Sequence, residues 1–438
     1  METVLLFVLG ILIFLVGLAL SIALHELGHL SFAKLFGVKV TQYMIGFGKT
    51  VFSLRRGETE YGVKLLPLGG YISMIGMFPP KHEGERARNA STGFYNSMVQ
   101  DARDASADTV APGEDGRTFY RLAPWKRIIV MFAGPFMNLV IAFVLFAVIL
   151  MGIGIQTRDV GSVSPCVPSG ATATTCSSDA PPSPAKLAGF RPGDLFVSID
   201  GRPTPTWDDA TAVFQRSAGR TLSVVVDNEG VKRSLTVTPV AAERAVVDQN
   251  GKPVVKNGLT QTRTVGTVGI ISGAITVRQP VTAVIPAFGN SVAQVAGVVI
   301  DLPQRMVGVW NAAFGSGPRQ ADGPVGIIGV GRVAGDVASD AQYPVVAKVQ
   351  TMLSLLASLN IALFVFNMIP LLPLDGGHIV GAVWEWIKRA WAKALGRREP
   401  RPVDMARLMP VTFAVIVVLG AMSLLLAYAD IVKPITLG

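Results

Sequence analysis

Four long runs without a charged residue dominate this sequence and constrain what it can fold into. Each run is apolar and long enough, at about 20 residues, to cross ~30 Å of hydrocarbon as a helix. They cover Thr3–Leu24, Ile128–Ile155, Val349–Leu374 and Leu408–Ala429. Half of the 438 residues are hydrophobic, which is unusual for a soluble protein. We therefore expect a polytopic α-helical membrane protein with four transmembrane helices.

A fifth uncharged run, Pro280–Ile300, differs in composition from the other four. It contains Asn290, Ser291 and Gln294 together with several small residues. We interpret it as an amphipathic helix that lies on a surface, within an extracytoplasmic helical region over 276–345. The first run lacks a basic start and is longer than the apolar core of a signal peptide, so we expect it to remain in the mature protein.

The net charge of +9 is concentrated in two short connections. By the positive-inside rule these connections face the cytoplasm, which places both termini and the stretch 156–348 outside. We attribute the charge to topology and contact with anionic lipid, since no nucleic-acid motif is present. The basic residues are Arg121, Lys126 and Arg127 before the second run, and Lys388, Arg389, Lys393, Arg397, Arg398, Arg401 and Arg407 after the third.

Between the spans the composition changes several times. Val38–Met77 is rich in β-branched and aromatic residues and is broken by glycines, with Arg-Arg-Gly-Glu as the expected hairpin tip. The division we predict is a first span over 1–36, a membrane-associated β-loop region over 37–79, a flexible cytoplasmic loop over 80–120, a second span over 121–156, an extracytoplasmic linker over 157–183, a soluble domain over 184–275, a third span over 346–378, a basic cytoplasmic loop over 379–407 and a fourth span over 408–430.

The soluble domain over 184–275 has the pattern of a small β-rich module. Its first strand alternates through Leu195, Val197 and Ile199, and Asn228-Glu229-Gly230 joins two later strands. The stretch Ala-Gly-Phe-Arg-Pro-Gly-Asp, followed by Ile-Asp-Gly, resembles a bacterial PDZ domain. Such a domain either binds an extended peptide end at a strand edge or serves as a steric filter. Its candidate carboxylate-binding loop is Thr267, Val268, Gly269 and Ile270.

The two cysteines, Cys166 and Cys176, both fall in the external linker. An oxidising compartment permits a disulfide between them. Two free thiols in a Ser/Thr/Pro-rich linker fit the sequence equally well. Neither cysteine is near a metal-type cluster, so zinc-thiolate chemistry is not expected.

The sequence His-Glu-Leu-Gly-His begins where the first apolar run ends. On a helix, His25 and His29 lie on one face, where both imidazoles can bind one Zn²⁺. Glu26 is placed to act on a water at the metal. Ionisable groups at membrane depth are costly unless paired or ligated, which favours function over chance. Gly28 permits close approach of another backbone.

A third protein ligand is needed for a hydrolytic zinc site, and Asp375 is the best candidate. The remaining histidines are His82, in a polar loop, and His378. The third apolar run ends in Phe-Asn-Met-Ile-Pro-Leu-Leu-Pro-Leu-Asp-Gly-Gly-His. Its prolines break the helix just before Asp375, and two glycines follow, so the backbone can turn the carboxylate inward.

HExxH near one end, Leu-Asp-Gly about 350 residues later, and a PDZ-like domain between them together resemble the site-2 protease family of intramembrane metalloproteases. The resemblance covers nearly the whole chain. It implies that His25, His29 and Asp375 bind one zinc ion and that Glu26 is the catalytic base.

The same resemblance implies a substrate-binding role for two further motifs. Asn367 matches an asparagine that holds the substrate backbone, and Gly46, Phe47 and Gly48 match the Gly-x-Gly of a membrane-dipping β-loop that pairs with the unwound substrate. Gly323-Pro324-Val325 resembles a segment found before the third span. Thirteen residues before Asp375, where a further asparagine is often found, this chain has Ala362, which leaves the role of Asn360 open.

The function implied is hydrolysis of peptide bonds within or beside the transmembrane segments of single-span proteins. Anti-sigma factors already cut once by another protease are the usual substrates, and the location is the bacterial cytoplasmic (inner) membrane. With an external N-terminus, the 22 residues of Thr3–Leu24 rise about 33 Å, which places the zinc toward the cytoplasmic side. Two rivals are a metal transporter and an inactive PDZ scaffold. The sequence does not define an oligomeric state.

Overall fold

The computed structural model describes residues 2–79, 94–168, 176–177, 179–204, 206–246, 255–256, 259–273, 275–315, 319, 323–341 and 343–434. The chain divides into two compact units. The first joins Met1–Ile149 to Pro280–Gly438, and the second is Leu150–Gln279.

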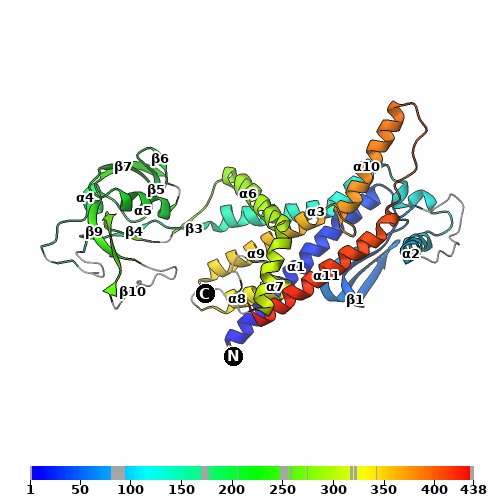
Figure 1. Ribbon diagram of the computed structural model, residues 1–438, viewed down its shortest axis with the longest axis horizontal. Helices are drawn as coiled ribbons and strands as arrows, with labels where there is room; N and C mark the ends of the chain where they lie inside the picture. The colour runs from blue at the N-terminus through cyan, green and yellow to red at the C-terminus, as the bar shows by residue number, and fades with distance from the viewer. Residues whose placement is uncertain are drawn as a thin grey trace. The chain divides into compact units, whose positions relative to one another are not determined.

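Five helices of the described chain are long and apolar enough to cross a membrane (Figure 1). They confirm the prediction of a polytopic membrane protein. We expected four spans, and the fifth helix, α6, is the one predicted to lie on a surface. The five are α1 (Glu2–Leu35), α3 (Pro124–Ala147, extended by a π-helix over Val148–Ile153), α6 (Val281–Ile300), α9 (Val345–Asn367) and α11 (Met409–Val432, preceded by a 3-10 turn over Met405–Leu408).

Small residues allow α1 to pack closely on its neighbours. A Cβ added to Gly28 would lie 2.4 Å from the carbonyl oxygen of Ala133 on α3. A Cβ added to Gly10 would lie 2.5 Å from the carbonyl oxygen of Ala334 on α8 (Ile327–Ser339). Such close backbone approach is how helices associate where no hydrophobic effect drives them together. The predicted role of Gly28 is confirmed.

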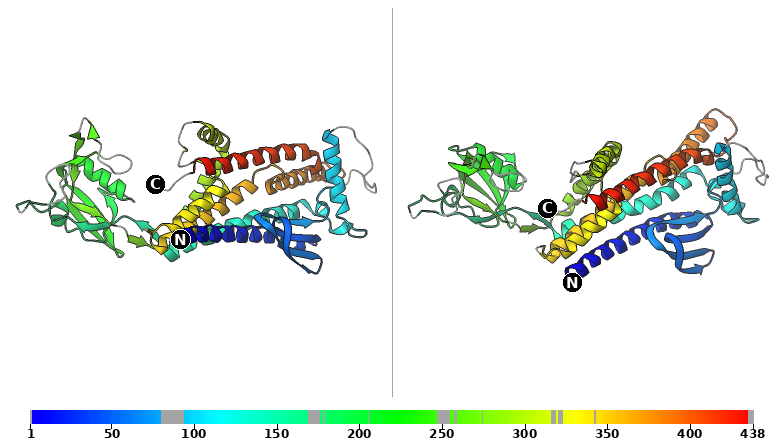
Figure 2. Two further views of the ribbon diagram at one scale, coloured as in Figure 1. Left: turned by 90° about the horizontal axis from the view of Figure 1, so that it is seen from below. Right: turned by 60° about the horizontal axis from the view of Figure 1, so that its bottom comes forward.

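A long hairpin of β1 (Val40–Arg56) and β2 (Thr59–Met74) lies beside the C-terminal half of α1 (Figure 2). Its tip is the predicted Arg-Arg-Gly-Glu, where Gly57 has a φ of +63°. The β1 segment 42–45 is aligned with both 60–63 and 70–73 of β2, so β2 lies on both sides of it. The outer part of the hairpin exposes Val51, Phe52, Leu54, Leu65 and Leu66.

At the hairpin tip, Arg117 donates two hydrogen bonds of 2.8 Å to Glu58. These bonds hold the pKa of the Glu58 carboxyl below its ordinary value.

Two segments predicted as polar loops contain helices instead. Within 80–120, Phe94–Asp108 forms α2, and within 379–407 most of the chain belongs to α10 (Asp375–Ala394). Ion pairs that link each helix to a distant segment accompany both differences. On α10, the fully buried Glu385 pairs with Arg127 of α3 at 2.5 Å and accepts a hydrogen bond from the Val403 backbone. On α2, Arg103 pairs with Asp404.

The region predicted as helical between the soluble domain and the third span contains α6, α7 (Leu302–Phe314) and α8. A buried pair fixes α8 to the end of α11. Asp430 of α11 accepts hydrogen bonds from Arg319 at 2.7 Å and from the Gly329 backbone at 2.8 Å.

The second unit is built on a four-stranded sheet in the order β6-β5-β7-β8. The turn between β7 and β8 has positive φ at Glu229 and Gly230, which suits a two-residue hairpin. The core includes Phe196, Phe214 and Val224. The elements are α4 (Pro184–Ala188), β5 (Leu195–Ile199), β6 (Arg202–Pro203), α5 (Trp207–Arg216), β7 (Leu222–Asn228), β8 (Val231–Val237), β9 (Val240–Ala245), β10 (Val255–Lys256), β11 (Leu259–Thr260) and β12 (Thr262–Thr267).

Strand β5 departs from the alternation of buried and exposed side chains that the sequence predicted. Phe196 and Ile199 are buried, whereas Leu195 and Val197 are only partly buried. A register shift between Phe196 and Ser198 explains the change, because one extra residue in a strand turns the following side chains to the other face.

The predicted linker over 157–183 is partly strand. Here β3 (Ile155–Thr157) pairs with β14 (Ile275–Val277), and β4 (Val160–Val163) pairs with β13 (Ile270–Ser272). Cys166 and Cys176 form a disulfide, which decides the alternative that the sequence left open.

We predict that changing Cys166 and Cys176 to serine lowers the free energy of unfolding of the second unit by roughly 2 to 3 kcal/mol, because the disulfide closes a short loop in the unfolded chain. Denaturant unfolding of residues 150–279 measures this. Ser177→Ala, which leaves the disulfide intact, should unfold with the wild type. Equal stability of the double variant and the wild type would contradict the prediction.

Candidate metal centre

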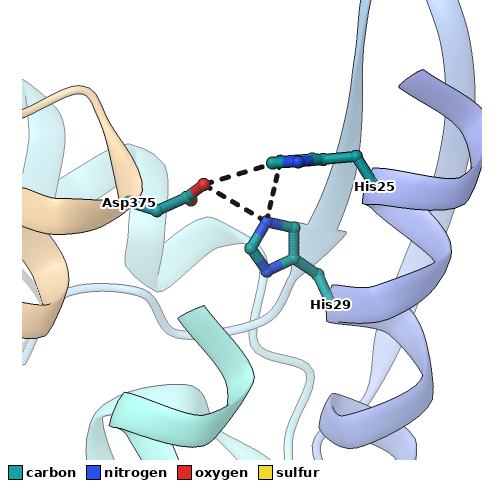
Figure 3. Close-up of side chains that lie close together, drawn as sticks. All are labelled: His25, His29 and Asp375. Carbon is teal, nitrogen blue, oxygen red and sulfur yellow. Dashed lines mark hydrogen bonds and ion pairs between the residues drawn. The ribbon is translucent and has the colours of Figure 1, made fainter. Parts of the chain in front are cut away.

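Three side chains from distant parts of the chain point toward one another in the first unit (Figure 3). His25 and His29 come from α1, and Asp375 is the first residue of α10. The two Nε2 atoms are 3.2 Å apart, and each lies 3.5 Å from Oδ2 of Asp375. The side chains of the three residues are between 6% and 18% exposed.

The spacing of these donor atoms fits a zinc ion. Tetrahedral coordination with ligands at about 2.0 to 2.2 Å places neighbouring donors about 3.3 to 3.6 Å apart. The observed separations of 3.2, 3.5 and 3.5 Å are close to that range. Two imidazoles and one carboxylate leave the fourth position for water or substrate, as catalytic zinc sites require.

The chain between α9 and α10 presents the carboxylate. Helix α9 ends at Asn367, and Asp375 begins α10 after a turn that contains Pro370 and Pro373. A Cβ on Gly376 would lie 2.3 Å from the Ile369 carbonyl oxygen. The turn therefore folds tightly against the first residues of α10, as the prolines and glycines of the motif predict.

Helix α3 contacts both imidazoles. Nδ1 of His29 lies 2.7 Å from the carbonyl oxygen of Val130, and Nδ1 of His25 lies 3.0 Å from the side-chain amide of Asn138. A Cβ on Gly134 would lie 2.1 Å from Nε2 of His29, so only glycine leaves room for the metal-binding nitrogen. None of these three residues of α3 was predicted from the sequence as part of the site. A polar Asn138 within an apolar run was the available signal.

The predicted catalytic base, Glu26, is buried and interacts electrostatically with His25, His29 and Asp375. Strand β2 passes beside it. A Cβ on Gly70 would lie 3.0 Å from Cγ of Glu26. The hairpin that exposes an apolar surface is thus in contact with the helix turn that carries the metal site.

The motif Gly46, Phe47 and Gly48 lies in β1, and both glycines have positive φ, at 92° and 87°. Phe47 is 47% exposed and stacks on Tyr71, the residue after Gly70. The motif is therefore linked to Glu26 by two contacts of β2: Phe47 stacks on Tyr71, and the adjacent Gly70 lies against Glu26.

Three other polar residues singled out in the sequence lie outside the cluster of three ligands. Asn367 is the half-buried last residue of α9. Asn360 is fully buried and donates to the Ser21 hydroxyl at 2.9 Å, which ties α9 to α1 one turn before His25. His378 interacts electrostatically with Asp375 and is not one of the three clustered ligands. His82 lies outside the described residues.

The predicted carboxylate loop, Thr267–Ile270, belongs to the second unit. The Val268 carbonyl accepts a hydrogen bond from the Ala185 amide at 2.8 Å, and the Gly269 carbonyl accepts one from the Ser164 amide at 2.9 Å. Beside it lies a groove of about 360 Å³ lined by β9 residues 240–243 and by Pro168, Pro181, Pro182 and Pro184, with Val167.

Two imidazoles, a carboxylate and a nearby glutamate on a bundle of apolar helices define a membrane-embedded zinc metallopeptidase. The family model described as Peptidase family M50 matches residues 13–399. The chain therefore belongs to peptidase family M50, the site-2 protease family whose motifs the sequence resembles.

Relatives support this assignment over nearly the full length. Zinc metalloprotease Rip1 of Mycobacterium tuberculosis (strain ATCC 25618 / H37Rv) is 34% identical over 441 residues, covering 98% of this chain and 99% of the relative. Rip1 of Mycolicibacterium smegmatis is 30% identical over 450 residues, with 98% and 99% covered. Metalloprotease MmpA of Caulobacter vibrioides is 27% identical over 395 residues, covering 87% of this chain and 88% of the relative.

We predict that Gly134→Ala weakens the zinc affinity of the chain at least about tenfold, the lower end of what loss of an orienting contact costs metal sites, and so lowers the zinc that the chain retains on dialysis against a chelator. The added Cβ occupies the space of the His29 metal-binding nitrogen. Zinc is counted by elemental analysis after dialysis. Gly420→Ala, on α11 with open space around its Cβ, is the matched control and should keep its zinc. Full zinc content in Gly134→Ala would refute the assignment of Nε2.

Proposed function

We propose that this chain is an intramembrane zinc endopeptidase that hydrolyses peptide bonds within or beside transmembrane segments of single-span proteins. The observation that carries the proposal is the position of the cluster. Its two histidines and Glu26 lie on α1, a helix of 34 residues with apolar side chains exposed along most of its length. A hydrolytic site on such a helix can meet a substrate that arrives through the lipid.

The residues of the site have distinct roles in the reaction. His25, His29 and Asp375 hold the zinc ion, which when bound supplies Lewis acidity toward a water and the scissile carbonyl. Glu26 takes the proton of the attacking water and passes it to the leaving amine. Its burial among the ligands keeps this proton transfer away from bulk water.

The hairpin supports a role in unwinding the substrate. A helical substrate has its carbonyls in hydrogen bonds and must open before hydrolysis. Exposed backbone in lipid needs a partner, and pairing with a strand near Gly46, Phe47 and Gly48 supplies one. The exposed apolar side chains of the hairpin suit a place in the lipid, and the contact of Gly70 with Glu26 puts the strand next to the site. Asn367, at the end of α9, is proposed to hold the substrate backbone.

The proposed topology has four spans, α1, α3, α9 and α11, with α6 on the membrane surface. The basic connections before α3 and after α9 then face the cytoplasm, and both termini and the second unit lie outside. The basic residues on and after α10 support this orientation. The zinc site then lies toward the cytoplasmic side of the bacterial inner membrane.

The proposed biological role is regulated intramembrane proteolysis of anti-sigma factors or similar proteins after a first cut. The second unit is proposed to be a PDZ-like domain that excludes bulky ectodomains or binds the new chain end. Its turn at 267–270, where Gly269 has a positive φ, and the groove along β9 support the second possibility. Among the described residues β9 pairs only with β12, so its other edge has no strand partner, and we propose that an extended peptide pairs there.

The glutamate beside the metal ligands separates this proposal from its rivals. A metal transporter needs ligands but no base, and an inactive scaffold needs neither. Glu26 is buried where a hydrolase requires a proton acceptor, although burial of a carboxylate in an apolar helix is costly.

We predict that Glu26→Gln abolishes cleavage of a tagged single-span substrate, by about 10² to 10⁴-fold, while zinc remains bound. The amide keeps the shape of the carboxylate and cannot accept the proton. Cleavage in proteoliposomes and zinc content are measured on the same preparation. Glu229→Gln, in the exposed turn of the second unit, is the control with unchanged activity. Persistent cleavage by Glu26→Gln would overturn the mechanism.

We predict that the second unit enforces the order of the two cuts. Replacing Thr157–Ile275 with a flexible Gly/Ser linker should permit cleavage of a substrate that still carries its ectodomain. Both the wild type and the variant should cut the trimmed substrate, which controls for folding. If the variant cuts the trimmed substrate and still rejects the untrimmed one, the filter lies elsewhere.

A further inference from the structure

We propose that Asn138 is a positioning residue of the metal centre, whose amide oxygen accepts a hydrogen bond from Nδ1–H of His25 and so fixes that imidazole with Nε2 toward the zinc. The inference rests on the zinc centre of the proposed function. It adds an orienting side chain from α3 that contacts a ligand and not the substrate.

The protonation of His25 follows from its geometry. Its Nε2 faces Nε2 of His29 at 3.2 Å and the Asp375 carboxylate at 3.5 Å, so Nε2 is the metal-binding atom. A neutral imidazole carries one proton, and with Nε2 given to the metal that proton is on Nδ1. Nδ1 is then a donor and needs an acceptor.

The atom group that faces Nδ1 is the amide of Asn138, at 3.0 Å. Asn138 is 1% exposed, and its Oδ1 is a buried atom without a hydrogen-bond partner among the described residues. The nitrogen of the amide faces His25. A half-turn of the amide exchanges the two atoms and places the unpartnered oxygen against Nδ1–H. One rotation thus satisfies both the orphaned acceptor and the donor that metal binding requires.

The proposal assigns a shared role to one face of α3, which contacts both imidazoles. Val130, Gly134 and Asn138 are spaced four residues apart, so they lie on one face of the helix. The Val130 carbonyl lies 2.7 Å from Nδ1 of His29, and Gly134 leaves space for Nε2 of the same ring. Asn138 serves His25 as Val130 serves His29. One helix face therefore orients both imidazoles.

The expected effect is on zinc affinity. Outer partners of ligating histidines fix the ring and the tautomer, and their loss typically weakens metal binding 10 to 100-fold. Asn138→Leu has a similar size and no acceptor. Asn138→Asp keeps an acceptor at the same place. An acceptor role predicts weaker zinc binding for Asn138→Leu alone. A packing role predicts wild-type binding for both variants, and a role of the amide nitrogen as donor predicts weaker binding for both.

The experiment measures zinc affinity of the full-length chain in nanodiscs by competition with a chelator. We expect Asn138→Leu, and Asn138→Ala in parallel as a variant without added bulk, to bind zinc about 10 to 100-fold more weakly than the wild type. Asn138→Asp should bind zinc at least as tightly as the wild type. The ligand-field spectrum of the Co²⁺-loaded chain should change in the Leu and Ala variants and stay close to wild type in the Asp variant.

The matched control is Asn290→Leu, which makes the same change at an exposed amide on the apolar helix α6 and should leave zinc affinity unchanged. The inference is overturned if Asn138→Leu and Asn138→Ala keep wild-type affinity, or if Asn138→Asp is weakened as much as they are. Zinc binding is read without any substrate. A wild type that binds zinc but cuts no membrane protein would therefore refute the proposed function and leave the role of Asn138 standing.

Discussion

A divalent cation and the groups that hold it must be stabilised on helices that otherwise carry apolar side chains, and the rest of the first unit depends on this constraint. Two imidazoles alone would leave the charge of zinc uncompensated in a medium where charge is costly. Asp375 supplies an anionic ligand from a second helix, 3.5 Å from both imidazole nitrogens. The fold therefore has to bring α1 and the start of α10 together.

Helix α3 contacts both α1 and α10 and so holds the two ligand-bearing helices together. It approaches α1 closely at Gly28, contacts both imidazoles through Val130 and Asn138, and holds α10 through the buried pair of Arg127 and Glu385. A buried ion pair adds little net stability, but its geometry fixes how two helices are aligned. Here that alignment determines where Asp375 lies relative to the histidines.

The sequence predicted the parts of this site that depend on local rules. The i, i+4 spacing of His25 and His29 is set by the helix itself, and the prolines and glycines around Asp375 showed that the chain must turn there. The features that the sequence did not predict, helix α10 and the register shift in β5, depend on long-range contacts. In the sequence, Glu385 is one acidic residue among many basic ones, which is typical of a polar loop. In the structure it is buried in an ion pair with Arg127, and this long-range contact, which the sequence does not show, accompanies the helix α10. The register shift at Phe196 likewise follows from pairing with β7.

The central claim is that residues 350 positions apart bind one zinc ion, and zinc K-edge X-ray absorption of the detergent-extracted wild type tests it most directly. The account predicts one zinc per chain with two imidazole nitrogens, one carboxylate oxygen and one water oxygen at about 2.0 to 2.2 Å, and loss of the carboxylate oxygen or of the zinc in Asp375→Ala. A zinc shell that is identical in Asp375→Ala and the wild type, or one that lacks imidazole, would contradict it.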